Sequence, residues 1–281
     1  MDAQVQAAPA DQPVLPEVLA TAGELTVRLA RTPEDVAAAQ ALRYEVFYKE
    51  MAAAPTPEMA ALERDFDRFD EICDILLVID GARPPERAVV GTYRMLRQEV
   101  AWANDGFYSA DEYDLTPLSR RFSESERGLE LGRSCVHRDY RSNATIQLLW
   151  RAIAEYMATY NIAWMFGCAS LPGTEPDALA EPLSFLHHHC LAPADLRVRA
   201  VPDRYVGMDR LPAGEVSPRR ALAMLPPLIK GYLRLGAHIG DGAVIDPQFG
   251  TTDVCIILPV RRIGQRYFSH FRPGAESGAK A

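Results

Sequence analysis

Short apolar runs typical of β-strands recur along the chain. In each run, apolar residues either alternate with polar ones or follow one another without interruption. The run at 25–30 alternates in the manner of an edge strand. The other predicted strands cover residues 75–79, 88–96, 129–136 and 162–169, and a final one ends at Leu258.

Two segments carry the signals of helices instead. Thr32 offers a capping side chain, Pro33 suits the first helical position and two acids follow, so a helix is predicted from there to about Lys49. The clearest helix covers residues 144–160. Its apolar residues recur every three or four positions and share one face: Ile146, Leu149, Ile153, Tyr156 and Tyr160. Strands and helices in this order predict an α/β fold, a mixed sheet with helices on both faces.

The two ends of the chain differ from its middle in composition. Residues 1–23 are rich in Ala, Pro and Gln, and residues 272–281 are small and polar. Such segments bury too little apolar surface to fold, so both are expected to be disordered tails. Residues 24–271 are then expected to form the folded domain.

Composition narrows the class of protein. A chain of 281 residues with 48% apolar and 24% charged residues is typical of globular proteins, and its net charge of -8 disfavours nucleic acid as a partner. The five cysteines form no Cys-x-x-Cys pair, which fits the reducing cytoplasm. The basic, apolar start of a signal peptide is missing, and no apolar run reaches the roughly 18 residues of a membrane span. Any membrane contact should therefore be peripheral.

The loop before the clearest helix has the features of an anion site. Arg138 and Arg141 supply two cations, and Ser142 and Asn143 are capping residues, beside the free N–H groups and the dipole of a helix N-terminus. An ordinary capped helix with exposed arginines is the alternative. The strand, loop and helix together resemble the cofactor loop of the GCN5-related N-acetyltransferase (GNAT) fold.

That resemblance implies a mostly antiparallel mixed sheet and a bound acyl donor. In the GNAT family this loop binds the diphosphate of coenzyme A or the phosphate of a carrier protein's phosphopantetheine arm. Ser142 and Ala144 stand where glycines are common, which favours the single phosphate of acyl carrier protein over the diphosphate of coenzyme A. The implied donor site comprises Arg138, Arg141, Ser142, Asn143 and Ala144, with no tightly bound cofactor.

Four short motifs resemble a narrower group. In order, they look like the signature of acyl-homoserine-lactone synthases and of the carrier-protein-dependent N-acyl amino acid synthases. The motif residues are Arg43 with Phe47, Asp67 with Asp70, Arg94 at a strand end, and Glu130 with Arg133.

The C-terminal third distinguishes among these relatives. Residues 226–237 and 246–253 closely resemble the ornithine acyltransferases that start ornithine-lipid synthesis, sometimes labelled hemolysin-like, and the likeness extends over residues 24–271. It implies transfer of a 3-hydroxyacyl group from acyl carrier protein to the α-amino group of L-ornithine, giving lyso-ornithine lipid. Residues 228–235, with Lys230 and Arg234 one turn apart, suit either contact with an anionic inner membrane or a plain docked helix.

The implied chemistry needs a polarised thioester carbonyl, a deprotonated amine and an oriented acceptor. Glu130 is the candidate base or amine-orienting carboxylate, and Arg133 its partner or the clamp on the acceptor carboxylate; a structural ion pair is the alternative. On a regular strand these two would point to opposite faces unless the strand is bulged. Gly132 is where a bulge costs little, and a bulge would turn N–H groups near Ser134 and Cys135 toward a carbonyl oxygen.

The remaining motif residues are expected to bind the substrate, each with a structural alternative. Asp67 and Asp70 suit an ornithine ammonium group or form a solvated loop. Arg43 and Arg94 bind the acceptor carboxylate or brace those acids as buried scaffolding. Phe47 completes this set of substrate contacts.

A cysteine nucleophile and a metal site are not expected. Cys135 has no evident His partner, and direct amine attack needs no acyl-enzyme. Consecutive positions of a helix diverge by about 100°, so the tract 187–189 of three histidines is not expected to bind a metal. The rival functions are a synthase for another amino acid or a homoserine-type acceptor, and a non-catalytic membrane-active protein. A lactone product would need S-adenosylmethionine recognition, for which no separate motif is seen.

Overall fold

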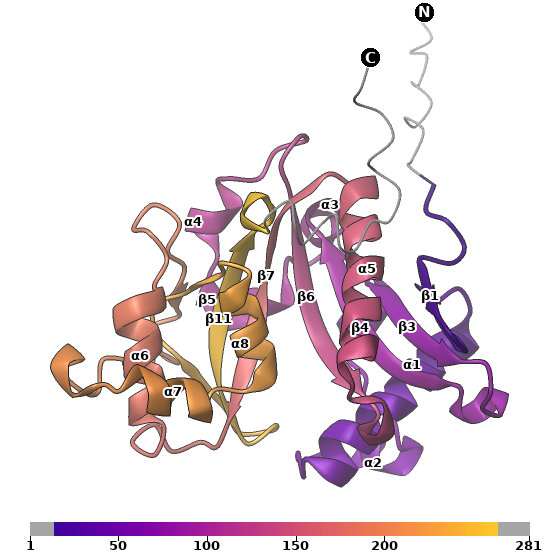
Figure 1. The fold of residues 1–281 in the computed structure, drawn as a ribbon, viewed down its shortest axis with the longest axis horizontal. Helices are drawn as coiled ribbons and strands as arrows, with labels where there is room; N and C mark the ends of the chain where they lie inside the picture. The colour runs from indigo at the N-terminus through magenta and orange to yellow at the C-terminus, as the bar shows by residue number, and fades with distance from the viewer. Residues whose placement is uncertain (1–13, 264–281) are drawn as a thin grey trace, which may run out of the picture.

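The computed structural model describes residues 14–263, and its main element is a twisted mixed sheet (Figure 1). The strand order is β1-β2-β3-β4-β6-β7-β11-β10, and β9 also pairs with β11. Every pairing is antiparallel except that of β6 with β7. The strands are β1 Ala20–Ala22, β2 Leu25–Leu29, β3 Asp74–Asp80, β4 Val89–Arg97, β6 Arg127–Val136, β7 Ile162–Pro172, β9 His238–Ile239, β10 Val244–Asp246 and β11 Thr251–Pro259. A small second sheet joins β5 Tyr113–Asp114 to β8 Arg199–Ala200.

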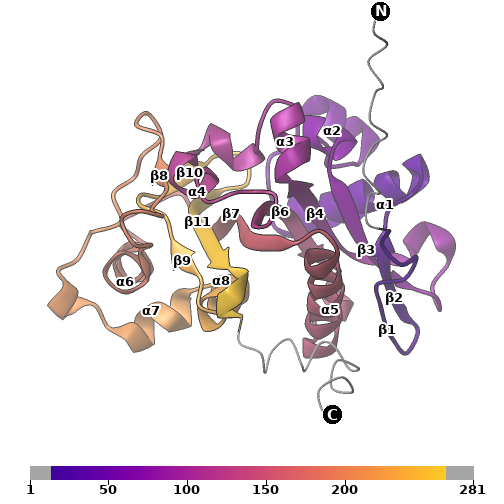
Figure 2. The same cartoon turned by 90° about the horizontal axis from the view of Figure 1, so that it is seen from above.

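Helices cover both faces of the sheet (Figure 2). The α5 side carries the largest apolar cluster, where Leu149 of α5, Leu183 of α6 and Ile229 of α8 join strand residues. On the other side, Ala39 of α1 packs on Ile75 and Leu77 of β3. The α-helices are α1 Pro33–Tyr44, α2 Pro57–Leu62, α3 Gln98–Ala103, α4 Thr116–Ser119, α5 Asn143–Thr159, α6 Ala180–Cys190, α7 Pro218–Met224 and α8 Pro227–Arg234. A π-helix, Glu45–Glu50, continues α1, and 3₁₀ turns lie at Arg68–Glu71, Pro85–Arg87, Tyr108–Asp111, Arg138–Tyr140, Ala213–Glu215 and Val260–Arg262.

The parallel strands β6 and β7 diverge at the centre of the sheet. Their parallel pairing runs from Arg127 opposite Ile162 to Glu130 opposite Phe166 and ends there, while β6 continues beside β4 and β7 beside β11. At the point of divergence Gly167 has φ +155°, and a Cβ there would lie 2.1 Å from the carbonyl oxygen of Leu131. Only glycine allows this close approach. Glu130 therefore sits where the two halves of the sheet separate.

The structure confirms the predicted fold class and most predicted elements. Thr32 caps α1 and accepts a hydrogen bond from the Asp35 amide. The helix predicted to continue to about Lys49 changes from α to π geometry at Glu45. Ile146, expected on the buried face of α5, is 46% exposed, because that face is centred on Leu148 and Leu149.

The predicted domain boundary at residue 24 needs a correction. β1 lies inside the segment assigned to the N-terminal tail, yet it pairs with β2, and Ala20 is buried in the main core. β2 is consequently flanked on both sides rather than being an edge strand. Residues 1–13 and 264–281 lie outside the described residues, and with them the predicted C-terminal tail and the last part of the predicted domain.

Candidate active site

A β-bulge in β6 determines how the central side chains are presented. Thr92 of β4 pairs with Cys135, but Arg94 pairs with Gly132, so β6 carries one extra residue at this point. Arg133 adopts the left-handed conformation, with φ +49°, a strain of about 1–2 kcal/mol for a residue with a side chain. The bulge predicted from the sequence is confirmed, although the strained residue is Arg133 rather than Gly132. A bulge of this kind commonly re-aims a side chain near an active site.

The bulge brings Glu130 and Arg133 to the same face of the sheet. The amide of Tyr108 donates to Glu130 Oε2 at 2.8 Å, and Arg133 Nη1 donates to the hydroxyl of Tyr108 at 3.4 Å. On a regular strand two residues three apart would face opposite ways. Tyr108 thus links the two predicted catalytic residues, and no sequence pattern had singled it out.

Glu130 is a buried carboxylate held by backbone amides. The residue is only 4% exposed. Its second oxygen, Oε1, accepts a hydrogen bond from the amide of Ser109 at 2.7 Å. Burial raises the pKa of Glu130, although the hydrogen bonds from Ser109 and Tyr108 and the charge of Arg94 oppose the shift. A carboxylate with a raised pKa accepts a proton more readily than an ordinary glutamate, which is the property a general base needs.

Beside Glu130, arginines and aspartates form a buried ion-pair network. Arg43 is fully buried, and its guanidinium pairs with Asp65 at 2.8 Å and with Asp70 at 2.6 Å. Arg94 pairs with Asp67 at 2.6 Å. Buried charges are tolerated when they are paired in this way. Arg43 and Arg94 therefore act as buried scaffolding for Asp65, Asp67 and Asp70, which is the structural alternative predicted for these two arginines.

Arg133 joins the same network but lies at its outer edge. It pairs with Asp67 at 3.1 Å and with Asp65 at 3.3 Å, while its guanidinium lies over the rings of Tyr108 and Phe249 at 5.0 and 4.9 Å. Its side chain remains 13% exposed, whereas that of Arg43 is 0% exposed. Arg133 is thus more exposed than Arg43, and its guanidinium contacts Asp65, Asp67 and the hydroxyl of Tyr108.

Asp67 and Asp70 do not form a solvated loop. They close a capping box around Arg68–Glu71, in which Asp67 accepts the Phe69 amide at 2.9 Å and Asp70 accepts the Asp67 amide at 3.2 Å. Asp65, which no motif included, is also buried. Its position in the acid-rich stretch of residues 65–74 was the one signal available in the sequence. With arginines already on these three acids, an ammonium group has little to gain here.

The residues after the bulge point to different faces. Cys135 is buried between Leu42 and Val46, and burial raises the pKa of its thiol to about 12, so the thiol stays protonated. This disfavours a nucleophilic role. Ser134 faces the opposite side, where it hydrogen-bonds with Tyr93.

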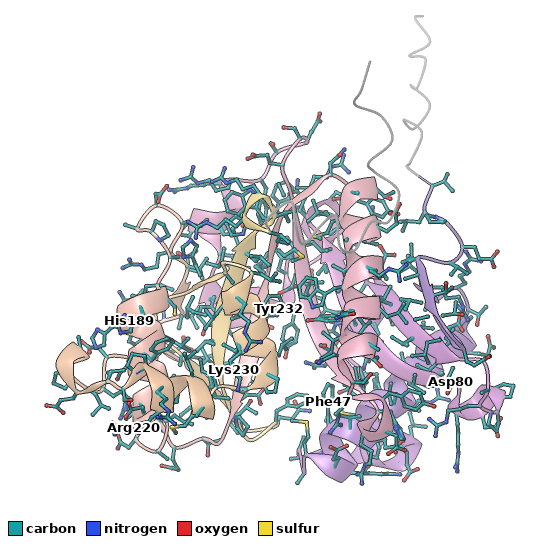
Figure 3. The ribbon with its side chains drawn as sticks, viewed as in Figure 1. Phe47, Asp80, His189, Arg220, Lys230 and Tyr232 are labelled. Atoms are coloured by element: carbon teal, nitrogen blue, oxygen red, sulfur yellow. The ribbon has the colours of Figure 1, made fainter. Side chains whose placement is uncertain are left out.

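Two buried tyrosines on the α5 side of the sheet, opposite Glu130 and Arg133, were also missed by the sequence. The hydroxyl of Tyr93 on β4 lies 2.8 Å from that of Tyr232 on α8, and both residues are buried. Figure 3 shows Tyr232 extending from α8 toward α5, where its ring meets the edge of Trp150 at 5.7 Å. Phe47, a motif residue, packs edge-on against Phe249 at 5.6 Å, beneath Arg133.

The predicted donor loop has the expected helix cap. Ser142 accepts the Thr145 amide through its side chain, and the first helical hydrogen bond runs from Ile146 N to Ser142 O. The amides of Asn143 and Ala144 precede that bond, so they are open to an anion.

The cations of this loop have an unexpected partner. Arg141 forms a forked pair with Glu50 of the π-helix, with Nη2 and Oε2 2.8 Å apart, and Arg138 lies 3.7 Å from the same carboxylate. Both arginine side chains remain exposed. A donor phosphate would therefore compete with Glu50 for them.

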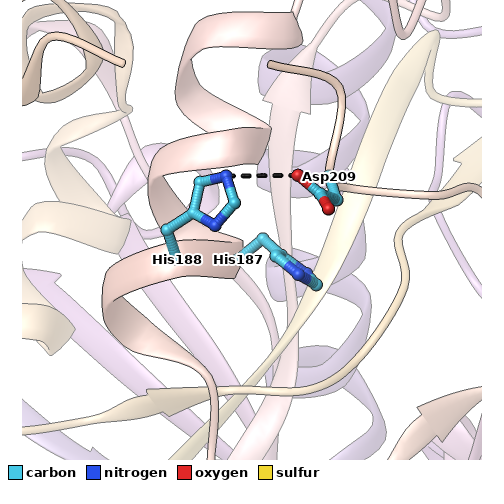
Figure 4. A group of neighbouring side chains, drawn as sticks. All are labelled: His187, His188 and Asp209. Carbon is cyan, nitrogen blue, oxygen red and sulfur yellow. Dashed lines mark ion pairs between the residues drawn. The ribbon is translucent and has the colours of Figure 1, made fainter. Parts of the chain in front are cut away.

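The histidine tract partly departs from the sequence prediction. His187 and His188 of α6 converge with Asp209, one ligand-type atom of each lying within 4.8 Å of the others (Figure 4). His188 Nε2 is 3.1 Å from Asp209 and 2.9 Å from the carbonyl of Leu211. The third histidine, His189, turns toward Phe185. Two neighbouring histidines thus approach each other more closely than helical divergence suggested, while the absence of a metal site remains a prediction.

Fold and site together define an acyltransferase of the GNAT class, and residues 42–151 match the family model described as an acetyltransferase (GNAT) domain. The chain is 53% identical, over 92% of each chain, to the L-ornithine N(alpha)-acyltransferase of Brucella abortus. It is 48% identical to the enzyme of the same name from Agrobacterium fabrum, over 90% of this chain and 87% of the other. The chain therefore belongs to the L-ornithine Nα-acyltransferase family.

Solved structures with a similar arrangement are more distant in sequence. An N-acyl amino acid synthase from uncultured soil microbes is 12% identical, with a TM-score of 0.45 over 84% of this chain and 91% of the other. A coenzyme A-dependent acyl-homoserine lactone synthase is 16% identical, with a TM-score of 0.45 over 85% of this chain and 83% of the other.

Proposed function

We propose that the protein transfers a 3-hydroxyacyl group from acyl carrier protein to the α-amino group of L-ornithine, forming lyso-ornithine lipid in the first step of ornithine-lipid synthesis. The names of its relatives in Brucella abortus and Agrobacterium fabrum support the acceptor. The observation that carries the proposal is the bulge in β6, which turns Glu130 and Arg133 to one face at the divergence of β6 and β7.

The proposed reaction needs few groups. The α-ammonium of the acceptor gives a proton to Glu130, and Arg133 holds the acceptor carboxylate. The neutral amine then attacks the thioester carbon, so that a C–N bond forms while the C–S bond breaks. The attacking nitrogen loses its second proton, and the leaving thiolate takes up one proton, so the protons balance. Backbone N–H groups of Ser134 and Cys135, beside the bulge, are proposed to stabilise the oxyanion.

An acceptor competition tests this function. The protein is incubated with 3-hydroxyacyl carrier protein and an equimolar mixture of ornithine, lysine, glutamine and homoserine, and the products are resolved by mass spectrometry. N-acyl-ornithine should dominate. Preferential acylation of another amino acid would replace ornithine as the acceptor, and the absence of any N-acyl product would end the proposal.

The donor is proposed to bind at the N-terminus of α5 as the phosphopantetheine arm of the carrier protein, without a tightly bound cofactor. The open amides of Asn143 and Ala144 and the exposed side chains of Arg138 and Arg141 support a single phosphate there. Because Glu50 pairs with both arginines, its charge should weaken donor binding.

Opposite changes in this loop should have opposite effects on the donor. Arg138→Glu with Arg141→Glu should raise KM for acyl carrier protein by about tenfold or more, since two phosphate-attracting charges become repulsive. Glu50→Gln should lower that KM, because it releases both arginines. Steady-state kinetics at fixed ornithine measure both, and KM for ornithine serves as the control. If neither variant changed KM for the donor, the phosphate would bind elsewhere.

Peripheral contact with an anionic membrane is proposed for the surface of α7 and α8. Leu222, Met224 and Leu228 are exposed there, 40–47% each, near Lys230, which Figure 3 shows on α8. Exposed apolar side chains beside cations suit an anionic interface. Among residues 14–263, no helix is long and apolar enough to cross a membrane.

Vesicle sedimentation tests this contact. Wild-type protein should sediment with phosphatidylglycerol vesicles and much less with phosphatidylcholine vesicles, and Leu222→Ser with Leu228→Ser should reduce the bound fraction several-fold. Leu62→Ser, at an exposed leucine on α2, provides the matched control. Equal sedimentation of the double variant and wild type would exclude this surface as the contact.

A further inference from the structure

Three carboxylates converge behind the candidate active site. Glu112, Asp246 and Asp253 each place one oxygen within 4.8 Å of the others. They come from the end of the Tyr108–Asp111 turn, from β10 and from β11. Glu112 is 4% and Asp253 7% exposed, whereas Asp246 is partly exposed and connects the group to the surface.

This cluster, unlike the neighbouring network, carries an excess of negative charge. Among the described residues its one ion pair joins Glu112 to Arg204 at 3.3 Å. Burial first, and then the charges of Glu112 and Asp246, raise the pKa of Asp253 to about 7. Carboxylates placed this close repel one another unless a cation joins them.

A second observation is independent of the number of acids. Oε2 of Glu112 is buried and, within the described part of the chain, has no hydrogen-bond partner. Oxygens of the other two acids are engaged: Asp253 Oδ1 accepts the Thr251 hydroxyl at 2.8 Å, and Asp246 Oδ1 accepts the Gln248 amide at 2.8 Å. A buried acceptor without a donor costs about 1–3 kcal/mol. Besides Arg204, the side chain that hydrogen-bonds to the Glu112 carboxylate is the thiol of Cys168, a weak donor. Glu112 therefore has room for a stronger donor at Oε2.

The cluster adjoins Glu130 on one side. Ser109 donates its amide to Glu130, and its hydroxyl lies 3.4 Å from the sulfur of Cys168. The charge of Glu112 is in turn the largest electrostatic influence on the thiol of Cys168, after burial itself.

On the other side, the cluster is joined to Arg133. Phe249 donates its amide to Asp246 at 3.0 Å, and the guanidinium of Arg133 lies over the Phe249 ring. The carboxylate cluster is thus connected to Glu130 through Ser109 and Cys168, and to Arg133 through Phe249.

We infer that Glu112, Asp246 and Asp253 bind the side-chain ammonium of the acceptor, a diamino acid, and so determine its selection. The inference rests on the proposed function, in which Glu130 meets the α-ammonium and Arg133 the carboxylate. An ammonium group has three N–H donors and no acceptor, which suits three converging carboxylates. An acceptor with an apolar side chain leaves those carboxylates unpaired in a buried place, and a site of this kind rejects it strongly.

Binding and turnover with two acceptors test the inference. L-norvaline has the carbon skeleton of ornithine without the side-chain amine. Wild type should bind ornithine at least about 30-fold more tightly than norvaline by calorimetry, because charge-assisted hydrogen bonds discriminate the two. Asp253→Asn and Glu112→Gln should each lose most of this preference, and kcat/KM should show the same change. Asp203→Asn, at an exposed acid, is the matched control and should retain it.

Folding of the variants is checked without ligand. The raised pKa of Asp253 means that its ionisation costs stability as pH rises through about 7. Asp253→Asn should therefore melt at a higher temperature than wild type at pH 8 and lose that advantage near pH 4. Glu112 and Asp246 are the charged groups that raise this pKa, and hydrogen bonds from Thr251 and Ser170 oppose them.

The outcomes separate the inference from the proposed function. If ornithine bound to wild type but not to the variants and no acyl product formed, the binding site would stand and the acyl-transfer proposal would fail. If wild type acylated ornithine and both variants kept its preference over norvaline, the inference would be overturned. Stabilisation of the wild type by Mg²⁺ or Ca²⁺, but not by ornithine, would assign the cluster to a metal and also overturn it.

Discussion

Replacing Arg133 by Ala is expected to lower kcat/KM for L-ornithine by about 10²–10³-fold, chiefly through KM. A forked, charge-assisted pair with the acceptor carboxylate is worth about 1.5–3 kcal/mol, and misplacement of the acceptor adds to the loss. Arg133 also pairs with Asp65 and Asp67, so the variant should be less stable by about 1–3 kcal/mol. Steady-state kinetics and a thermal melt measure the two effects separately.

A change of acceptor shows whether Arg133 binds the acceptor carboxylate or has a structural role alone. 1,4-Diaminobutane carries both amines of ornithine but no carboxylate, so Arg133 has nothing to hold. The ratio of kcat/KM for ornithine to that for the diamine should be large in wild type and close to one in Arg133→Ala. Arg133→Lys keeps the charge without the fork and should lie between them. An unchanged ratio in Arg133→Ala would leave Arg133 with a structural role alone.

Replacing Glu130 by Gln is expected to lower kcat by about 10²–10⁴-fold, the usual contribution of a general base. The carboxylate must be ionised to accept a proton, and burial raises its pKa. In wild type, kcat/KM should therefore fall as pH decreases through that raised pKa, and the variant should lack this part of the profile. Activity against pH, measured at saturating donor, supplies the comparison.

Glu130 also holds the Tyr108–Asp111 turn in place. Control variants must separate this structural role from the role as a base. The amides of Tyr108 and Ser109 both donate to it, so a Gln amide would place a donor against a donor. Ser109→Ala retains the backbone bonds but removes the hydroxyl that holds the pKa of Glu130 down, so the base-dependent part of the pH profile should persist and move to higher pH. Glu126→Gln, at an exposed acid near the start of β6, should retain full activity. If Glu130→Gln kept the wild-type profile and kcat, the base would have to be another group.

How much of this site the sequence predicted depends on how local each signal was. Glu130 and Arg133 lie in one strand. Because side chains alternate faces along a strand, the two can share a face only if the strand is bulged, and the bulge is confirmed. Arg43 and Asp70 belong to two separate motifs. Their buried pairing was one of two predicted alternatives, because sequence spacing carries no information on burial.

The missed residues have no local pattern. Tyr93 and Tyr232 lie 139 positions apart, and Glu112 meets Asp253 only because the turn before β5 packs beside β11. Tyr108 contacts Glu130 through its backbone amide. Any residue except proline offers such an amide, so the identity of the side chain does not predict this contact. Glu50 meets Arg141 because α1 continues as a π-helix, a change of geometry that hydrophobic periodicity does not report.

The central claim is acylation of the α-nitrogen of ornithine by a site that recognises all three charges of the acceptor. The most direct measurement is tandem mass spectrometry of the product formed from 3-hydroxyacyl carrier protein and L-ornithine labelled with ¹⁵N at the α-position. The acyl fragment should retain ¹⁵N, which places the new amide on the α-nitrogen. An acyl fragment carrying unlabelled nitrogen, showing transfer to the side-chain amine, would contradict it.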